Sequence, residues 1–269
     1  MATFLPKVHR AFVPSSQLHL PLGVEQVWST EAWISHLLAY GKQLDYTCLS
    51  RLMVVEGSLS RFSSAVTALK VERPLRVLDV GGSIGENLLQ VFQSIPPSIH
   101  PRIEWTVCDN ARSIEIGRGN FEGMPYQPRF TTFEALVHSG DRFDLSLLCG
   151  TLQYLENPIQ AVHGILDMLR GDGAGIYIHR TPFCVSSGEH VVIRQLVHPA
   201  FGAFQDRYIG ETQLNLLSLQ KLLDDLDKTG CEVRYVAYFQ PYVDQMKSLP
   251  APFREVHYID LFIARAAGR

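Results

Sequence analysis

Short apolar runs alternate with helix-like segments along the larger part of the chain. Seven runs of four to eight residues predict strands, at positions 75–80, 103–108, 129–133, 145–148, 175–179, 232–239 and 257–264. Apolar residues at three-to-four spacing predict helices among them, at positions 85–93, 111–120, 158–169 and 218–228. Because strands that alternate with helices form parallel sheets, the pattern predicts an α/β domain with a doubly wound sheet.

The last two predicted strands are connected differently from the others. The segment between 239 and 257 contains three prolines and no helical pattern, so we expect an antiparallel return there. A mostly parallel sheet of seven strands with the last one antiparallel looks like the Rossmann-like fold of class I methyltransferases. A likeness of fold does not establish the chemistry.

The N-terminal part of the chain precedes this alternation and has a helical pattern of its own. Apolar residues recur at helical spacing from 29 to 69, and Thr30 fits the N-cap position. We expect residues 1–70 to form an N-terminal helical extension and residues 71–269 to form the binding domain. The extension, which contains Tyr40, Lys42 and Tyr46, either closes over the cofactor or packs as a plain helix on the sheet edge.

Composition and charge narrow the range of partners. The chain has 269 residues, 46% of them apolar, and a formal net charge of −3, which fits one large domain and no basic face for nucleic acid. No apolar run reaches the roughly 20 residues that span a bilayer, and the N-terminus lacks a signal-peptide pattern. We therefore expect a cytoplasmic protein that acts on a small molecule, with no nucleic-acid or membrane partner and with a homodimer left open.

The sharpest motif is a glycine-rich turn that follows the first predicted strand and opens a helix. It consists of Asp79, Gly81, Gly82, Ser83 and Gly85. Glycines permit positive φ angles and let a ligand approach the backbone closely. The helix N-terminus behind the turn offers free N–H groups. We therefore expect the turn to bind a nucleoside-containing ligand.

Two details of this turn favour S-adenosylmethionine (SAM) over a dinucleotide. A carboxylate at Asp79 would repel a pyrophosphate, whereas it can accept hydrogen bonds from the ammonium group of SAM, directly or through water. The spacing also differs from the GxGxxG of dinucleotide sites, and Ser83 replaces the middle glycine of the usual D-x-G-x-G-x-G. We expect the turn to face the methionine carboxylate and the ribose of SAM.

The ends of the next strands complete the expected cofactor site, because ligands bind at the carboxyl ends of parallel strands. Asp109 ends the second strand, where its carboxylate is expected to accept both ribose hydroxyls, with Asn110 beside it. Thr132 and Phe133 end the third strand and are expected to flank the adenine, although Phe133 fits a core position equally well. The end of the fourth strand, expected beneath the sulfonium, comprises Cys149, Gly150 and Thr151.

Two further segments follow the fourth and fifth predicted strands. They read LQYLENP at 152–158 and HRTPF at 179–183. With these segments, the chain resembles a bacterial family of SAM-dependent methyltransferases whose members carry LQYL-x-x-P and RTPF at the same places. The resemblance covers roughly residues 75–240. It implies the class I fold and the use of SAM but little about the acceptor. Asp109 departs from the glutamate that family members often have at that place.

Both segments are expected to line the mouth of the site because both follow strand ends. Gln153 and Tyr154 offer an amide and a phenol, and Tyr154 is nearer to the expected sulfonium. Arg180 suits a carboxylate or phosphate of the substrate, unless it forms a salt bridge that shapes the loop. His179 fits a base by its pKa range, although a histidine at a strand end is more often a structural donor. Tyr154, His179 and Arg180 are the candidate catalytic side chains.

A long excursion separates the fifth strand from the next helix. It spans about 184–212 and is rich in polar side chains, including Tyr208, which we expect to contact the substrate. Such excursions usually form an acceptor pocket or a lid. Its histidines do not have metal-site spacing, and the five cysteines of the chain form no CxxC pair, so we expect reduced thiols and no metal.

Four functions remain open at this point. The leading hypothesis is methyl transfer from SAM to an oxygen or nitrogen of a small molecule, with an acidic substrate held by Arg180. A second hypothesis keeps SAM but attacks its methionine side chain, as in an intramolecular cyclase or an aminocarboxypropyl-type enzyme that releases methylthioadenosine. A third is a non-catalytic SAM-fold binding protein. A fourth is a nicotinamide dehydrogenase, which the absence of GxGxxG disfavours.

Overall fold

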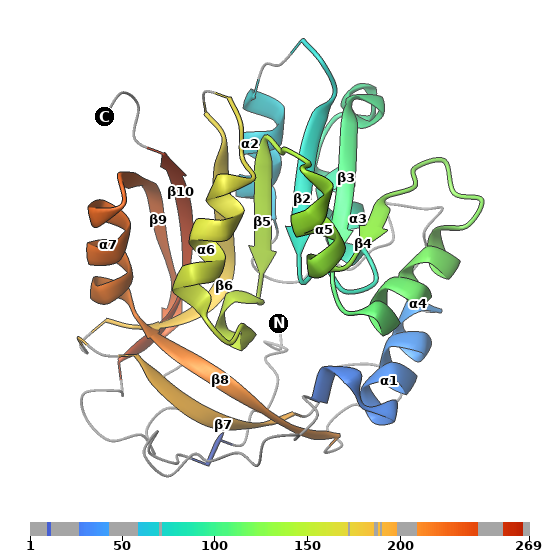
Figure 1. The fold of residues 1–269 in the computed structure, drawn as a ribbon. Helices are drawn as coiled ribbons and strands as arrows, with labels where there is room; N and C mark the ends of the chain where they lie inside the picture. The colour runs from blue at the N-terminus through green and yellow to red at the C-terminus, as the bar shows by residue number, and fades with distance from the viewer. Residues whose placement is uncertain are drawn as a thin grey trace.

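The computed structural model describes residues 10–11, 27–42, 59–69, 72–171, 173–185, 188, 190–197, 209–241 and 255–265. Within them, helices cover both faces of one twisted sheet (Figure 1). The parallel centre of the sheet has the order β4-β3-β2-β5-β6. The bounds of these strands are Arg129–Thr131, Ile103–Cys108, Leu75–Val80, Leu145–Cys149 and Gly175–Cys184. β2 occupies the middle because nearly all of its side chains are apolar or buried.

On the side of β6 away from β5, the strand pairing is antiparallel. β10 (Val256–Arg265) pairs antiparallel with β6 along its length and with β9 (Cys231–Pro241) on its far side. All seven predicted strands are therefore present, and the antiparallel last strand is confirmed. The residues that connect β9 to β10, with the prolines at 250 and 252, lie outside the described part of the chain.

Two hydrophobic clusters attach the helices to opposite faces of the sheet. One holds the face covered by α2 (Ser60–Ala68), α3 (Glu86–Ser94) and α4 (Ala111–Phe121). The other holds the face covered by α5 (Phe133–Ser139), α6 (Pro158–Asp167) and α7 (Leu219–Lys228). Neighbouring residues of β2 belong to different clusters, Val77 to the first and Leu78 to the second, as the pleat of a strand requires. A short 3-10 helix, η4 (Pro97–Arg102), leads into β3.

Among the described residues the sheet has ten strands, three more than the pattern predicted. The additional strands come from the N-terminus and from the excursion: β1 (Arg10–Ala11), β7 (Val191–Val197) and β8 (Gly210–Ser218). β7 pairs antiparallel with both β1 and β8, and β8 joins the end of β6 at Phe183 and Cys184. In Figure 1, β7 and β8 cross below the carboxyl ends of the central strands.

Two predicted strand ends were wrong. β6 continues to Cys184, so the HRTPF segment lies inside a strand and does not follow one. The pairing with β10 continues as far as Cys184, which the local pattern did not indicate. The third strand ends at Thr131, and Phe133 is instead the first residue of α5. Thr132 caps that helix, since its side chain accepts a hydrogen bond from the Ala135 N–H.

The N-terminal segment forms a short 3-10 helix, η2 (Val27–Ser29), followed by α1 (Glu31–Gly41). The expected N-cap is confirmed, because the Thr30 hydroxyl accepts a hydrogen bond from the Trp33 N–H at 3.3 Å. α1 packs against α4, where Gly41 faces Asn120 so closely that a Cβ would lie 2.6 Å from its side chain. Among the described helices, none is both long and apolar enough to cross a bilayer.

We expect the Phe62→Ala variant to be less stable than the native protein by about 3–5 kcal/mol, because the ring is fully enclosed and its loss leaves a cavity. Phe62 lies on α2 between Trp105 and Tyr177. Denaturant unfolding measures the difference. Phe133→Ala is the matched control, since the ring of Phe133 is 44% exposed, and its cost should stay below about 1 kcal/mol. Equal costs would contradict this packing.

Candidate functional site

The glycine turn links the carboxyl ends of β2 and β3. The Gly81 N–H donates to the Cys108 carbonyl at 2.7 Å, and the Ser83 N–H donates to Oδ2 of Asp109 at 2.8 Å. Gly81, Ser83 and Gly85 all have positive φ angles, of 69°, 51° and 92°. Ser83 adopts an angle that is uncommon for a residue with a side chain. The turn therefore has a strained conformation that Asp109 helps to hold.

At two glycines of the turn, neighbouring side chains leave no room for a Cβ atom. A Cβ at Gly81 would lie 2.3 Å from the Thr151 side chain, so the turn lies directly beside the loop after β5. A Cβ at Gly82 would lie 2.4 Å from Oδ2 of Asp79. The backbone of the turn is thus packed tightly against the side chains of Thr151 and Asp79.

Asp79 lies beneath the turn and is completely buried. Its Oδ1 accepts a hydrogen bond from the Asn87 amide at 3.0 Å, and its Oδ2 accepts one from the Trp105 indole at 3.3 Å. Burial raises the pKa of Asp79 to about 7. The prediction that Asp79 contacts the ammonium of SAM is not supported by this position, because both of its oxygens are enclosed and hydrogen-bonded within the protein.

Asp109 ends β3 at the place expected for a ribose ligand. Its Oδ1 accepts hydrogen bonds from the backbone N–H and the side-chain amide of Asn110, at 2.7 and 2.8 Å. Asn110 in turn caps α4 by accepting from the Ser113 N–H at 3.0 Å. Burial raises the pKa of Asp109. The carboxylate is thus held by donors from Ser83, Asn110 and the Ser113 side chain, at the edge where a ribose is expected.

Glu86, the first residue of α3, is a third carboxylate at this turn and was not predicted from the sequence. Its Oε2 atom is enclosed and has no hydrogen-bond partner among the described residues. Burial raises the pKa of Glu86 to about 8, and the charges of Asp79 and Asp109 raise it further. The available signal was an acidic residue directly after the turn, which alone indicates only a favourable helix start.

The remaining predicted cofactor residues lie at the same edge of the sheet. Gly150 follows β5 with a φ of 64°, and its N–H donates to the His179 carbonyl at 2.8 Å. Burial raises the pKa of the Cys149 thiol to about 12, so it stays protonated at neutral pH. Thr132 and Phe133 begin α5 beyond β4, and the ring of Phe133 is 44% exposed, so it remains accessible to a ligand.

The LQYL segment forms a 3-10 helix, η5 (Leu152–Tyr154), that is held by contacts within the protein. The amide of Gln153 is buried and bonded at both ends, to the Gly150 carbonyl at 2.8 Å and to the Thr181 hydroxyl at 3.3 Å. The Tyr154 hydroxyl donates to Gln195 of β7 at 3.0 Å. Gln153 therefore connects η5 to β6 through both ends of its amide.

Asp260 of β10 organises the other candidate residues from below and was also missed. Its carboxylate accepts hydrogen bonds from the Tyr177 hydroxyl at 2.7 Å, from Nδ1 of His179 at 2.8 Å and from the Arg180 N–H at 3.2 Å. Arg61 of α2 lies 3.9 Å away. Asp260 and His179 are both buried. The signal in the sequence was a lone acidic residue within an apolar strand. Such a residue is buried only where hydrogen-bond donors surround it.

Arg180 lies at a bulge in β6. Its φ is 55°, and the register between β6 and β10 shifts where Asp260 accepts its N–H. The guanidinium is exposed, and no ion pair involves it among the described residues. The alternative of a loop-shaping salt bridge is therefore not supported in this part of the chain, and the charge is available to a ligand.

The N-terminal helix extends over this edge of the sheet. Burial raises the pKa of Tyr40 on α1, with a further rise from the carboxylate of Glu86 and an opposing effect from Arg180, so both charged groups lie near its hydroxyl. The ring of Trp28 on η2 contacts that of Trp33 on α1, with centroids 4.7 Å apart, and that of Tyr154 on η5, with centroids 4.8 Å apart. These contacts support a cover over the site. Tyr208 lies outside the described residues.

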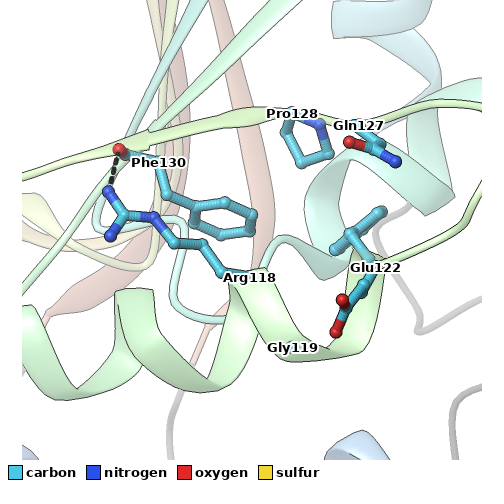
Figure 2. A pocket seen from close by; sticks show the side chains of 7 residues that line it. Arg118, Gly119, Glu122, Gln127, Pro128 and Phe130 are labelled. Carbon is cyan, nitrogen blue, oxygen red and sulfur yellow. Dashed lines mark hydrogen bonds between the residues drawn. The ribbon is translucent and has the colours of Figure 1, made fainter.

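A separate hollow of about 330 Å³ lies at the outer edge of the sheet, between α4 and β4. Figure 2 shows Arg118 on one side of it, bonded to the Phe130 carbonyl at 2.9 Å, and Glu122 and Gln127 on the other. None of its lining residues belongs to the predicted cofactor or substrate set.

Comparisons with solved structures agree with this architecture. A SAM-dependent methyltransferase from Clostridium acetobutylicum is 11% identical, with a TM-score of 0.53 over 84% of this chain and 98% of that chain. The cyclase SpnF is 14% identical, with a TM-score of 0.54 over 88% of this chain and 94% of that chain. Identities this low show the fold alone, which is the Rossmann-like methyltransferase fold that the sequence predicted.

Sequence comparisons add nothing to the structural ones, since no family model and no curated protein matches the chain. The resemblance carried by the LQYL and RTPF segments therefore stays a prediction.

We expect Gly82→Ala to destabilise the protein by about 1–3 kcal/mol, because the new methyl group would displace a buried carboxylate from its donors. The thermal midpoint measures the change. Gly119→Ala is the matched control: this glycine lies on the exposed side of α4 with open space around it, so the same substitution should stabilise by about 0.5–1 kcal/mol. A neutral Gly82→Ala would contradict the close contact with Asp79.

Proposed function

We propose that this protein is a SAM-dependent methyltransferase that acts on an oxygen or nitrogen of a small molecule. The observation that carries the proposal is the convergence of three carboxylates, Asp79, Glu86 and Asp109, on a glycine turn at the carboxyl edge of a methyltransferase-like sheet. A cationic nucleoside suits this surrounding. The pyrophosphate of a nicotinamide dinucleotide would be repelled by it, so the dehydrogenase hypothesis is disfavoured.

The residues around the turn fit the parts of SAM. Asp109 follows β3 at the place expected for the ribose, and Phe133 offers an exposed ring beside the place expected for the adenine. Gly81 and Gly82 leave room for the side chains of Thr151 and Asp79, which brings the turn close to the loop after β5. Gly150 and Thr151 lie next to Gly81, so the loop after β5 borders the methionine part of the site.

Bound SAM supplies an electrophilic methyl group on a positively charged sulfur. The protein has to align an acceptor atom behind that methyl group and exclude water. The aromatic rings of Tyr154 and Trp28 and the hydroxyl-bearing Tyr40 lie on the covering side of the site, where they favour a cation and displace solvent. The exposed guanidinium of Arg180 would hold a carboxylate of the acceptor molecule.

His179 is the candidate group for receiving a proton from the acceptor. The Asp260 carboxylate binds its Nδ1 at 2.8 Å, which fixes the ring and makes Nδ1 the protonated nitrogen of the neutral tautomer. In that tautomer the basic lone pair lies on Nε2, so Nε2 is the atom that would accept the proton. Tyr177 shares the carboxylate and stacks on the imidazole at 6.1 Å.

The fold does not separate methyl transfer from the rival reactions, since one similar structure is named a methyltransferase and the other a cyclase. A SAM-consuming cyclase or an aminocarboxypropyl-type enzyme would release methylthioadenosine. A non-catalytic protein would bind SAM and leave it unchanged. The nucleoside product therefore distinguishes these functions.

The test is incubation of the protein with SAM, alone and with a panel of small carboxylic acids that carry hydroxyl or amino groups, followed by mass spectrometry. We expect S-adenosylhomocysteine (SAH) to accumulate only when a suitable acceptor is present. Methylthioadenosine formed from SAM alone would replace the proposal with the cyclase hypothesis. Binding of NAD without binding of SAM would refute it.

Asp109→Ala should weaken SAM binding by about 1–3 kcal/mol, because charge-assisted hydrogen bonds to the ribose would be lost and Ser83 would lose its partner. Isothermal titration calorimetry measures the affinity. The control is Asp224→Ala, which removes an exposed carboxylate on α7. If both variants bind SAM like the native protein, Asp109 does not hold the ribose.

A further inference from the structure

The enclosed oxygen of Glu86 lacks a partner in a site that is otherwise closely hydrogen-bonded. Asp79 and Asp109, the carboxylates beside it, use both of their oxygens for donors within the protein. Oε2 of Glu86 has none among the described residues. The backbone N–H groups of Ile84 and Glu86 stabilise the rest of this carboxylate, but an enclosed oxygen without a donor is costly unless a ligand supplies one.

The groups around Glu86 make an anion an unsuitable ligand and a cation a suitable one. Asp79 of β2 and Asp109 of β3 add negative charge, and Tyr40 of α1 presents a neutral hydroxyl because burial raises its pKa. Arg180 of β6 acts electrostatically on Tyr40 but is not among the groups that shift the pKa of Glu86. The Cys149 thiol of β5 is protonated.

We propose that Glu86 is the carboxylate that binds the α-ammonium group of the cofactor, a role that the sequence assigned to Asp79. This inference rests on the proposed function. Of the carboxylates at the turn, Glu86 has an enclosed oxygen without a donor, and it occupies the first position of α3 directly after the glycines that the methionine part of SAM would contact. An ammonium group would supply the missing donor and a compensating charge.

The protonation of Glu86 gives the inference a second observable. Its raised pKa, about 8, means that the empty site holds a proton there at neutral pH. A cation that binds the carboxylate favours the ionised form and so lowers the pKa. Ligand binding near pH 7 should therefore release protons, and affinity should rise as the pH increases from 6 toward 8.

The direct test compares two ligands on two proteins. The ligands are SAH and its analogue with hydrogen in place of the α-amino group, and the proteins are the native chain and Glu86→Gln. We expect native protein to bind SAH about 10- to 100-fold more tightly than the analogue, as loss of a charged hydrogen bond predicts. In Glu86→Gln, SAH should lose most of that advantage, while the affinity for the analogue stays unchanged.

Calorimetry in buffers of different ionisation enthalpy measures the proton release in the same experiment. Glu86→Gln should release fewer protons than the native protein at pH 7. Glu104→Gln is the matched control, because it removes an exposed carboxylate at the amino end of β3, far from the turn, where it pairs with Arg76. Its ligand discrimination and proton release should equal those of the native protein.

Each outcome has a definite meaning. If the native protein binds neither SAM nor SAH, the proposed function fails, and this inference fails with it. If SAH binds but Glu86→Gln keeps the full preference over the analogue, the role of Glu86 is refuted and the proposed function stands. An equal loss in Glu104→Gln would assign the effect to net charge and refute the inference. The unfolding midpoint of Glu86→Gln should not fall, since the substitution replaces a buried carboxyl group, protonated in the empty site, with a neutral amide of the same size.

Discussion

The site depends on the hydrogen bonds that the buried carboxylate of Asp79 accepts. It joins three elements, because it belongs to β2 and accepts hydrogen bonds from Asn87 of α3 and Trp105 of β3. Removing a carboxylate from water is costly, and fixed donors are needed to offset that cost. The turn can lie directly above it because Gly82 has no side chain. The positions of Ser83, which donates to Asp109, and of Glu86 follow from this arrangement.

A second buried carboxylate supports the other half of the same edge. Asp260 holds the imidazole of His179 and the bulge at Arg180 as Asp79 holds the glycine turn. The two carboxylates are connected below the site by rings, since Trp105 contacts Phe62, and Phe62 contacts Tyr177, with centroids 6.1 and 5.7 Å apart. The half proposed for the cofactor and the half proposed for the acceptor are thus mounted on one packed layer, which keeps their separation fixed.

The features that the sequence predicted well are local. The central strands, the glycine turn, the helix at 111–120 and the helix start at Thr30 depend on periodicity, on φ angles and on a cap within a few residues. The features it missed depend on distant partners. The bulge at Arg180 exists because Asp260, 80 positions away, accepts its N–H. Gln153 was assigned to the substrate because its link to Thr181 is invisible in a linear pattern.

The excursion after β6 shows how such distant contacts build a cover. β8 pairs with the end of β6, and Asn215 on β8 donates to the carbonyls of Gln153 and Leu155, so the hairpin is attached to the sheet at one end. Farther along, Tyr154 of η5 contacts the ring of Trp28 and donates a hydrogen bond to Gln195 of β7. Side-chain contacts of this kind open more readily than the continuous backbone ladders of the central strands. A site that admits a substrate and then excludes water requires this difference in local stability.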